Sequence, residues 1–193
     1  MSKKIVFIHG SPRPTGNMRK AAMAAMAAAR EAGAEVAEID ACRLEARAPG
    51  CIGCQKCQQR PDYACALEDG IAKAVAGLPQ HDVIVMCSPV YWMSWTAQIK
   101  VVIDRMYSLI KFTPDGIDTP LRGKTLALLC VGGGPVEDNL DLLERQWRVP
   151  AQLIGTHFDS CLIPSAPYEP GALAADAEAM EKAAAFGRRL AGA

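Results

Sequence analysis

The chain has 193 residues, half of them hydrophobic and 22% charged, which is typical of one folded domain rather than a disordered chain. Basic and acidic residues each number 21, so the chain lacks the basic surplus that is typical of nucleic-acid-binding proteins. No apolar run is long enough to span a membrane, and the one after Lys3 and Lys4 is too short for a signal peptide, so we expect a cytoplasmic protein.

Short apolar runs alternate with longer helical patterns along the chain. We expect strands at residues 4–9, 35–39, 82–87, 125–131 and 152–158. We expect helices at residues 16–32, 69–76, 96–110, 137–149 and 172–190. This alternation predicts one α/β domain over residues 1–193, with a doubly wound parallel sheet and helices on both faces.

Residues 41–67 interrupt the alternation and show no clear periodicity, as expected for a functional loop. Cys51, Cys54, Cys57 and Cys65 lie in this segment. We expect Cys87, Cys130 and Cys161 to be small buried hydrophobes, because they lie in apolar strand-like runs. Cys42 is expected to be a bystander. His9, His81 and His157 are expected to be structural, because none has a partner at metal-ligand spacing.

Three loops follow predicted strands and meet at one edge of the predicted sheet, where open α/β sheets bind ligands. The first, residues 10–17, offers hydroxyl groups, an amide, a guanidinium group and the free N–H groups of a helix start, which together suit a phosphate. It is neither a Walker A motif nor a G-x-G-x-x-G turn, and an ordinary capped turn is the alternative.

The other two loops offer a surface for a flat ring. Tyr91 and Trp92 follow the third predicted strand, where adjacent aromatic side chains either cover a ring or pack the loop or a subunit interface. Gly132, Gly133 and Gly134 follow the fourth, where glycines allow a ligand close to the backbone or make a flexible turn.

The runs IHGSPRPTGN, SPVYWMSWTAQIKVVIDRMY and LRGKTLALLCVGGG together resemble the NADPH-dependent FMN reductase branch of the flavodoxin superfamily. The resemblance implies a flavodoxin-like five-stranded sheet in the order 2-1-3-4-5, a bound FMN that carries the chemistry without a catalytic side chain, and a homodimer or homotetramer. The cofactor-binding residues expected from it are Ser11, Arg13, Thr15, Gly16, Asn17 and Met18 in the first loop, Pro89, Val90, Tyr91 and Trp92 in the second, and Gly132, Gly133 and Gly134 in the third.

The cysteine spacing C-x-x-C-x-x-C, with a fourth cysteine after seven further residues, is typical of iron–sulfur ligation. It departs from the bacterial ferredoxin pattern and is more similar to the compact motif of the iron–sulfur flavoproteins, which resemble the FMN reductases in fold. The predicted metal ligands are Cys51, Cys54, Cys57 and Cys65, for a [4Fe–4S] cluster. A zinc ion, free thiols or a disulfide are the alternatives.

The sequence therefore predicts an FMN-dependent oxidoreductase that passes electrons from NAD(P)H to a flavin, a quinone or another small-molecule or protein acceptor. One alternative is an electron-transfer protein that carries FMN and a [4Fe–4S] cluster. A second is a zinc-containing or redox-sensing module without catalysis. Neither a nucleic acid nor a membrane is expected as a partner.

Overall fold

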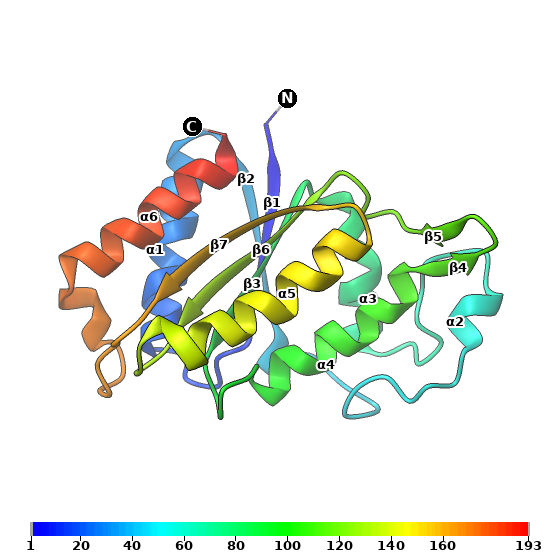
Figure 1. Ribbon diagram of the computed structural model, residues 1–193, viewed down its shortest axis with the longest axis horizontal. Helices are drawn as coiled ribbons and strands as arrows, with labels where there is room; N and C mark the ends of the chain where they lie inside the picture. Colours follow the sequence, from blue (N-terminus) through cyan, green and yellow to red (C-terminus); the bar gives the residue numbers. More distant parts are fainter. Residues whose placement is uncertain (1, 193) are drawn as a thin grey trace.

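A computed structural model describes residues 2–192 and shows a central parallel sheet between two layers of helices (Figure 1). The strand order is β2-β1-β3-β6-β7, which confirms the predicted flavodoxin-like order. The strands are β1 (Lys4–His9), β2 (Glu35–Asp40), β3 (Val83–Pro89), β6 (Thr125–Val131) and β7 (His157–Ile163). The helices around the sheet are α1 (Asn17–Glu31), α3 (Gly70–Gly77), α4 (Ala97–Arg105), α5 (Asp141–Leu153) and α6 (Ala177–Ala191).

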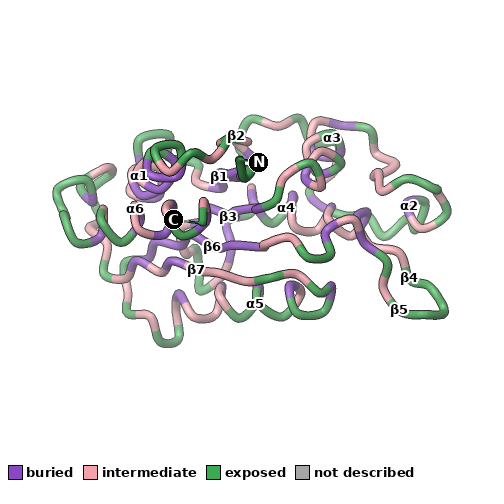
Figure 2. The backbone as a smooth tube through the Cα atoms, turned by 90° about the horizontal axis from the view of Figure 1, so that it is seen from above, coloured by how far each residue is buried: buried purple, intermediate pink, exposed green. Residues whose placement is uncertain are grey.

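The central strands are apolar along their whole length because helices cover both of their faces. Ile5, Phe7 and Val85 pack on one face against α1 and α6, and Val6 and Ile84 pack on the other against α3, α4 and α5. Figure 2 shows the buried strands between these two groups of helices. The three cysteines in strands β3, β6 and β7 are buried, as expected. Burial raises the pKa of each of these thiols, which for Cys161 reaches about 11.

The parallel register places the ends of four strands at one edge of the sheet. Ile5 pairs with Val83, Val83 with Thr125, and Thr125 with His157. The loops that follow β1, β3, β6 and β7 therefore leave the sheet side by side, which is where a ligand site forms in such folds.

The fifth strand of the sheet differs from the prediction, which placed it at residues 152–158. The helix before it was predicted to end at Val149, immediately before Pro150, but α5 contains Pro150 and continues to Leu153. Gly155, with φ of 69°, is the residue that lets the chain leave the helix, and β7 begins only at His157.

The segment between β2 and α3 is mostly irregular, as predicted for residues 41–67. Its one α-helical turn, α2 (Lys56–Gln59), lies beside a two-stranded hairpin that was not predicted, β4 (Lys111–Thr113) and β5 (Gly116–Asp118) (Figure 1). The Gln58 amide donates to the Ile110 carbonyl at 2.9 Å, which joins the segment to the hairpin. No helix within residues 2–192 is long and apolar enough to cross a membrane.

Candidate functional site

A cavity of about 420 Å³ opens at the carboxyl ends of the strands, and we call it the strand-end pocket. Its walls are Ser11, Arg13, Gly16, Asn17 and Met18 after β1, Pro89, Val90 and Tyr91 after β3, Val131, Gly132 and Gly133 at the end of β6, and Ala166, Pro167 and Tyr168 after β7. The structure thus brings together most of the predicted cofactor-binding residues from three separate loops. Thr15, Trp92 and Gly134 were predicted as well but do not line this cavity.

The start of α1 forms the polar end of the strand-end pocket. Gly16 is the residue before the helix, and no side chain in the described part of the chain caps its first turn, which also contains no acidic residue. A Cβ atom on Gly16 would lie 2.9 Å from the Cβ of Arg13, so the tight turn requires glycine. The N–H groups of this first turn, with the Ser11 hydroxyl and the Arg13 guanidinium group, are the donors that an anion requires.

Asn17 has a different role from the free donor that the sequence suggested. Its amide nitrogen donates to the Pro167 carbonyl at 2.6 Å, and its amide oxygen accepts from the N–H group of Leu173 at 3.1 Å. Both polar ends of the side chain are therefore used to hold the segment after β7 against α1. This segment supplies Tyr168, over whose ring the Arg13 guanidinium group lies at 5.8 Å.

A tight turn follows β3 and separates the two adjacent aromatic residues. Tyr91 and Ser94 exchange backbone hydrogen bonds of 2.9 and 3.0 Å, and Trp92 and Met93 between them have φ of 50° and 55°. Tyr91 stays at the pocket wall, whereas the Trp92 side chain is 95% exposed. The turn therefore directs only one of the two aromatic side chains to the pocket.

The glycine loop after β6 comes close to its neighbours because it lacks side chains. A Cβ atom on Gly132 would lie 2.8 Å from Leu140 and 3.1 Å from Val90. The Gly132 carbonyl accepts from the N–H group of Ala166 at 2.9 Å, which fixes the segment after β7 beside the loop. Sequence reasoning missed Pro167 and Tyr168, because the misplaced fifth strand hid the fact that this proline-rich segment also follows a strand.

The four predicted metal ligands line a second, much smaller cleft of about 20 Å³. Cys57 is buried, Cys65 is partly buried, and Cys51 and Cys54 are exposed. All four are free thiols, and residues 2–192 contain no group of three or more histidine, cysteine, aspartate or glutamate side chains arranged to hold a metal ion. The structure thus gathers the four cysteines around one cleft without the geometry of a closed metal site.

Arg105 at the end of α4 holds this cysteine segment to the rest of the fold. Its buried guanidinium group donates to the Gly50 carbonyl at 2.7 Å, to the Cys65 sulfur at 3.1 Å and to the Asp69 carboxylate at 2.9 Å. One side chain therefore contacts the residue before Cys51, the last cysteine of the segment, and Asp69, the residue that caps the start of α3. Sequence reasoning missed Arg105, because the pattern of the helix expected at residues 96–110 carries no signal that a charged side chain is buried there.

The carboxylate of Asp69 is buried together with Arg105. Burial raises the pKa of Asp69, but hydrogen bonds from the N–H groups of Arg47 and Ala72 and from Arg105 outweigh burial, so its pKa lies below the ordinary value. Asp69 is therefore ionised at neutral pH and balances the buried guanidinium charge.

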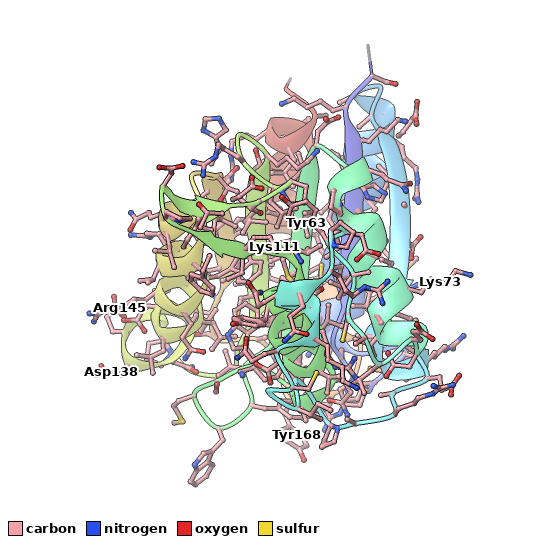
Figure 3. The ribbon with its side chains drawn as sticks, turned by 90° about the vertical axis from the view of Figure 1, so that its right-hand side faces the viewer. Tyr63, Lys73, Lys111, Asp138, Arg145 and Tyr168 are labelled. Carbon is pink, nitrogen blue, oxygen red and sulfur yellow. The ribbon has the colours of Figure 1, made fainter. Side chains whose placement is uncertain are left out.

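Lys111 provides a second attachment for the cysteine segment. Its ammonium group donates to the Cys57 carbonyl and, at 3.1 Å, to the Arg60 carbonyl. It also lies 5.4 Å from the centre of the Tyr63 ring, and Figure 3 shows these two side chains together at the end of the molecule. The hairpin that carries Lys111 therefore closes one side of the segment.

A model of one protein family, the NADPH-dependent FMN reductases, matches residues 3–146. The chain belongs to this family. The match includes the loops after β1, β3 and β6, and it also spans the whole cysteine segment. Family membership therefore agrees with the resemblance that the sequence motifs suggested.

Curated relatives of this family member carry a more specific name. An iron–sulfur flavoprotein of Methanocaldococcus jannaschii is 32% identical over 129 residues, which are 67% of this chain and 62% of the relative. One of Archaeoglobus fulgidus is 32% identical over 121 residues, which are 63% of this chain and 50% of the relative. The matches thus span only about half to two-thirds of the length of these relatives.

Solved structures share the fold at low sequence identity. An NAD(P)H:quinone oxidoreductase from Methanothermobacter marburgensis has a TM-score of 0.75 and 17% identity, over 98% of this chain and all of that one. An FMN-dependent NADH-azoreductase from Bacillus anthracis, in complex with FMN, has a TM-score of 0.71 and 13% identity, over 98% of this chain and 99% of that one. Likeness at this identity establishes the flavodoxin-like fold.

Proposed function

We propose that this chain is an FMN-dependent oxidoreductase that passes electrons from NAD(P)H to a flavin, a quinone or another acceptor. The observation that carries the proposal is the strand-end pocket, which combines one uncapped helix start with a wall of aromatic and glycine residues. One anion site beside a cavity of about 420 Å³ suits a mononucleotide with a flat ring. The family to which the chain belongs supports the same ligand.

The residues of the pocket fit FMN in chemistry and in shape. The first turn of α1, Ser11 and Arg13 would hold the phosphate, and Asn17 would position the segment that closes over it. Pro89, Val90 and Tyr91 would lie along one part of the ring, and Gly132 would let the ring approach the backbone. Bound FMN supplies the electron transfer, while these residues orient it and exclude water.

Two further features of the chain bear on its compartment and its oligomeric state. We place the protein in the cytoplasm, because all eight cysteines are free thiols, as reducing compartments favour. We also propose a homodimer or homotetramer. Its support is the exposed apolar group at the rim of the strand-end pocket, made of Tyr91, Trp92 and Met93.

Heat-released cofactor tests this proposal directly. Flavin released from the purified protein should behave as FMN in chromatography, and FAD or no flavin after reconstitution would contradict the proposal. Arg13→Ala should weaken FMN binding by about 1.5–3 kcal/mol, the scale of a hydrogen bond to a charged group. Arg145→Ala, which removes an exposed arginine away from the pocket, is the matched control and should leave the affinity unchanged.

A second candidate function is electron transfer through FMN and a [4Fe–4S] cluster. Two observations favour it: Cys51, Cys54, Cys57 and Cys65 line one cleft, and curated relatives are named iron–sulfur flavoproteins. Four thiolates are the donor set of such a cluster, which supplies one-electron chemistry when it is bound. The exposed segment with Cys51 and Cys54 would have to close toward Cys57 and Cys65 to complete the site.

Anaerobic iron and sulfide analysis separates the two candidates. The cluster requires about four of each per chain, and Cys54→Ser should abolish both while FMN stays bound. Cys42→Ser is the matched control, because Cys42 lies outside the cleft and donates instead to the Ser11 carbonyl at 3.2 Å. If the protein contains no iron but reduces its flavin with NAD(P)H, the proposed cluster would be wrong and the first proposal would stand.

A further inference from the structure

The guanidinium group of Arg105 points a charged donor at one of the four cysteines that line the small cleft. Its Nη1 atom donates to the Cys65 sulfur at 3.1 Å, although only 1% of Arg105 is exposed. A neutral thiol is a weak acceptor, and burying a guanidinium group away from water is costly. The contact therefore suits a sulfur that carries negative charge, as a metal-bound thiolate does.

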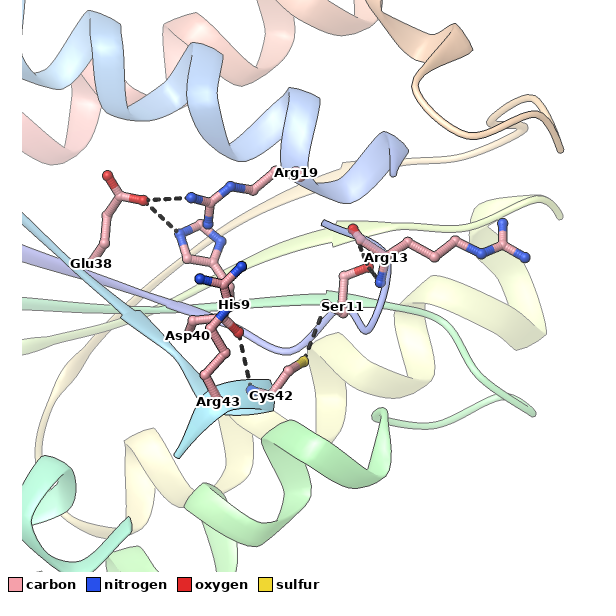
Figure 4. Close-up of polar contacts among 8 residues, drawn as sticks. All are labelled: His9, Ser11, Arg13, Arg19, Glu38, Asp40, Cys42 and Arg43. Atoms are coloured by element: carbon pink, nitrogen blue, oxygen red, sulfur yellow. Dashed lines mark hydrogen bonds and ion pairs between the residues drawn. The ribbon is translucent and has the colours of Figure 1, made fainter. Parts of the chain in front are cut away.

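Cys42 shows that an arginine next to a cysteine does not by itself produce such a contact. Its thiol donates to the Ser11 carbonyl at 3.2 Å (Figure 4). The neighbouring Arg43 directs its Nε atom to Asp40 at 3.3 Å and not to the sulfur. In the described part of the chain, Arg105 is the one arginine that donates to a sulfur atom. The contact is thus a specific feature of the cysteine cleft.

The carboxylate of Asp69 balances the guanidinium charge behind this contact. It accepts from Nη2 of Arg105 at 2.9 Å, and both side chains are fully buried. The N–H groups of Arg47 and Ala72 also donate to Asp69, at 2.8 and 2.9 Å, so the backbone fixes its position. The Cys65 sulfur therefore meets a held ion pair that solvent screens little.

The other three cysteines of the cleft have no comparable donor. The Cys57 sulfur accepts only from the Gln58 amide, at 3.9 Å, and Cys51 and Cys54 are exposed. Hydrogen bonds to ligand sulfurs raise the reduction potential of an iron–sulfur cluster, because one-electron reduction adds negative charge that an N–H group stabilises. A charged donor such as Arg105 acts more strongly than a neutral amide.

We propose that Arg105, by donating to Cys65, raises the reduction potential of the centre that the four cysteines hold, and that Asp69 limits this effect by balancing the guanidinium charge. The inference rests on the second candidate function, in which these cysteines hold a [4Fe–4S] cluster. Arg105 acts through Cys65, so it is a positioning residue and not a metal ligand. It would let the site accept an electron more readily than four cysteines alone would.

Potentiometric titration of the anaerobically reconstituted, FMN-loaded protein tests the proposal, with low-temperature EPR to separate the cluster from the flavin. The double variant Arg105→Met with Asp69→Asn removes the donor to the sulfur and leaves no buried charge without a partner, so it should fold. Its equilibrium constant for one-electron reduction should fall about tenfold, the effect of one charged hydrogen bond. The reduction potential should therefore fall by about 59 mV.

Asp69→Asn alone should shift the potential in the opposite direction. It leaves Arg105 on the sulfur but removes the carboxylate that balances its charge, so the reduction potential should rise. Asparagine also caps helices, so α3 keeps its start. If Arg105 and Asp69 only held the segment in place, both variants would loosen it and shift the potential in the same direction. Opposite shifts therefore identify an electrostatic effect.

Tyr63→Phe is the matched control, because the Tyr63 hydroxyl attaches the same segment to Asp118 of the hairpin and neither residue lines the cleft. It should change the equilibrium constant for reduction less than about twofold, since the contact is exposed. A full iron content with equal potentials in all variants, or with both shifts in one direction, would overturn this inference alone. Wild-type protein without iron would overturn it together with the second candidate function, and the FMN analysis is independent of either result.

Discussion

The strand-end pocket and the cysteine segment are held in place by different kinds of interaction. The pocket lies at the ends of parallel strands, and backbone hydrogen bonds such as that from Ala166 to Gly132 fix its loops. The cysteine segment has one helical turn and depends on a few side chains, above all Arg105. The loss of a single side chain should therefore lower the stability of the pocket less than that of the cysteine segment.

The largest expected effect comes from Arg105→Ala. It leaves the Asp69 carboxylate buried without its partner, which should lower the free energy of unfolding by about 3–5 kcal/mol. Denaturant titration measures this loss, and labelling of Cys57 and Cys65 should become faster. Arg60→Ala is the control, because Arg60 pairs with Asp62 in solvent, and it should leave stability unchanged.

The Arg105→Ala variant also tests the contrast between the two regions. If the strand-end pocket rests on the sheet alone, FMN affinity measured under conditions where the variant is folded should equal that of the wild type. A parallel loss of FMN binding would mean that the pocket and the cysteine segment form one cooperative unit.

Acid should weaken the same ion pair. The folded pKa of Asp69 lies below its unfolded value of about 3.9, so its contribution to stability is complete above that pH and is lost as the pH falls through the folded pKa. The stability difference between the wild type and Asp69→Asn, from urea midpoints, should therefore shrink on going from pH 7 to pH 3. A constant difference would show that the charge of Asp69 is not what Arg105 requires.

The sequence was sufficient for the parts of the molecule that depend on periodicity. The apolar runs of β1, β3 and β6 were predictable because buried parallel strands are apolar throughout, whereas the order of the strands came from the resemblance to the FMN reductases. It was also predictable that the loops around the strand-end pocket meet, because the carboxyl ends of parallel strands lie at one edge of the sheet. The start of β7 was not predictable, because Pro150 is a strong helix-stop signal that α5 overrides.

The directions of individual side chains and the contacts between distant segments could not be predicted from the sequence. The pattern that makes α4 amphipathic also contains Arg105, and only the arrival of Gly50, Cys65 and Asp69 from another segment makes that position buried. The hairpin of β4 and β5 is too short for a periodic signal. Trp92 and Tyr91 look equivalent in the sequence, but the backbone turn separates them.

A smaller effect is expected from Asn17→Ala. The substitution leaves the Pro167 carbonyl and the N–H group of Leu173 without their side-chain partner, at a cost of about 1–3 kcal/mol. Faster proteolysis after β7, together with weaker FMN binding, would show that Asn17 holds this segment over the pocket. Asn139→Ala is the control, since the Asn139 side chain makes no hydrogen bond within residues 2–192.

The smallest expected effect, from Trp92→Asn, tests the strand-end pocket at its rim. Trp92 is 95% exposed and has φ of 50°, a conformation that asparagine adopts more readily than tryptophan. The variant should be as stable as the wild type or more stable by less than about 1 kcal/mol, with the same FMN affinity, because the indole does not line the pocket. Tyr91→Ala removes a wall residue and should weaken FMN binding by comparison. If Trp92→Asn loses FMN while its oligomeric state is that of the wild type, the indole must turn from solvent onto the ring when the cofactor binds, and the rim would be a mobile cover rather than part of a fixed wall.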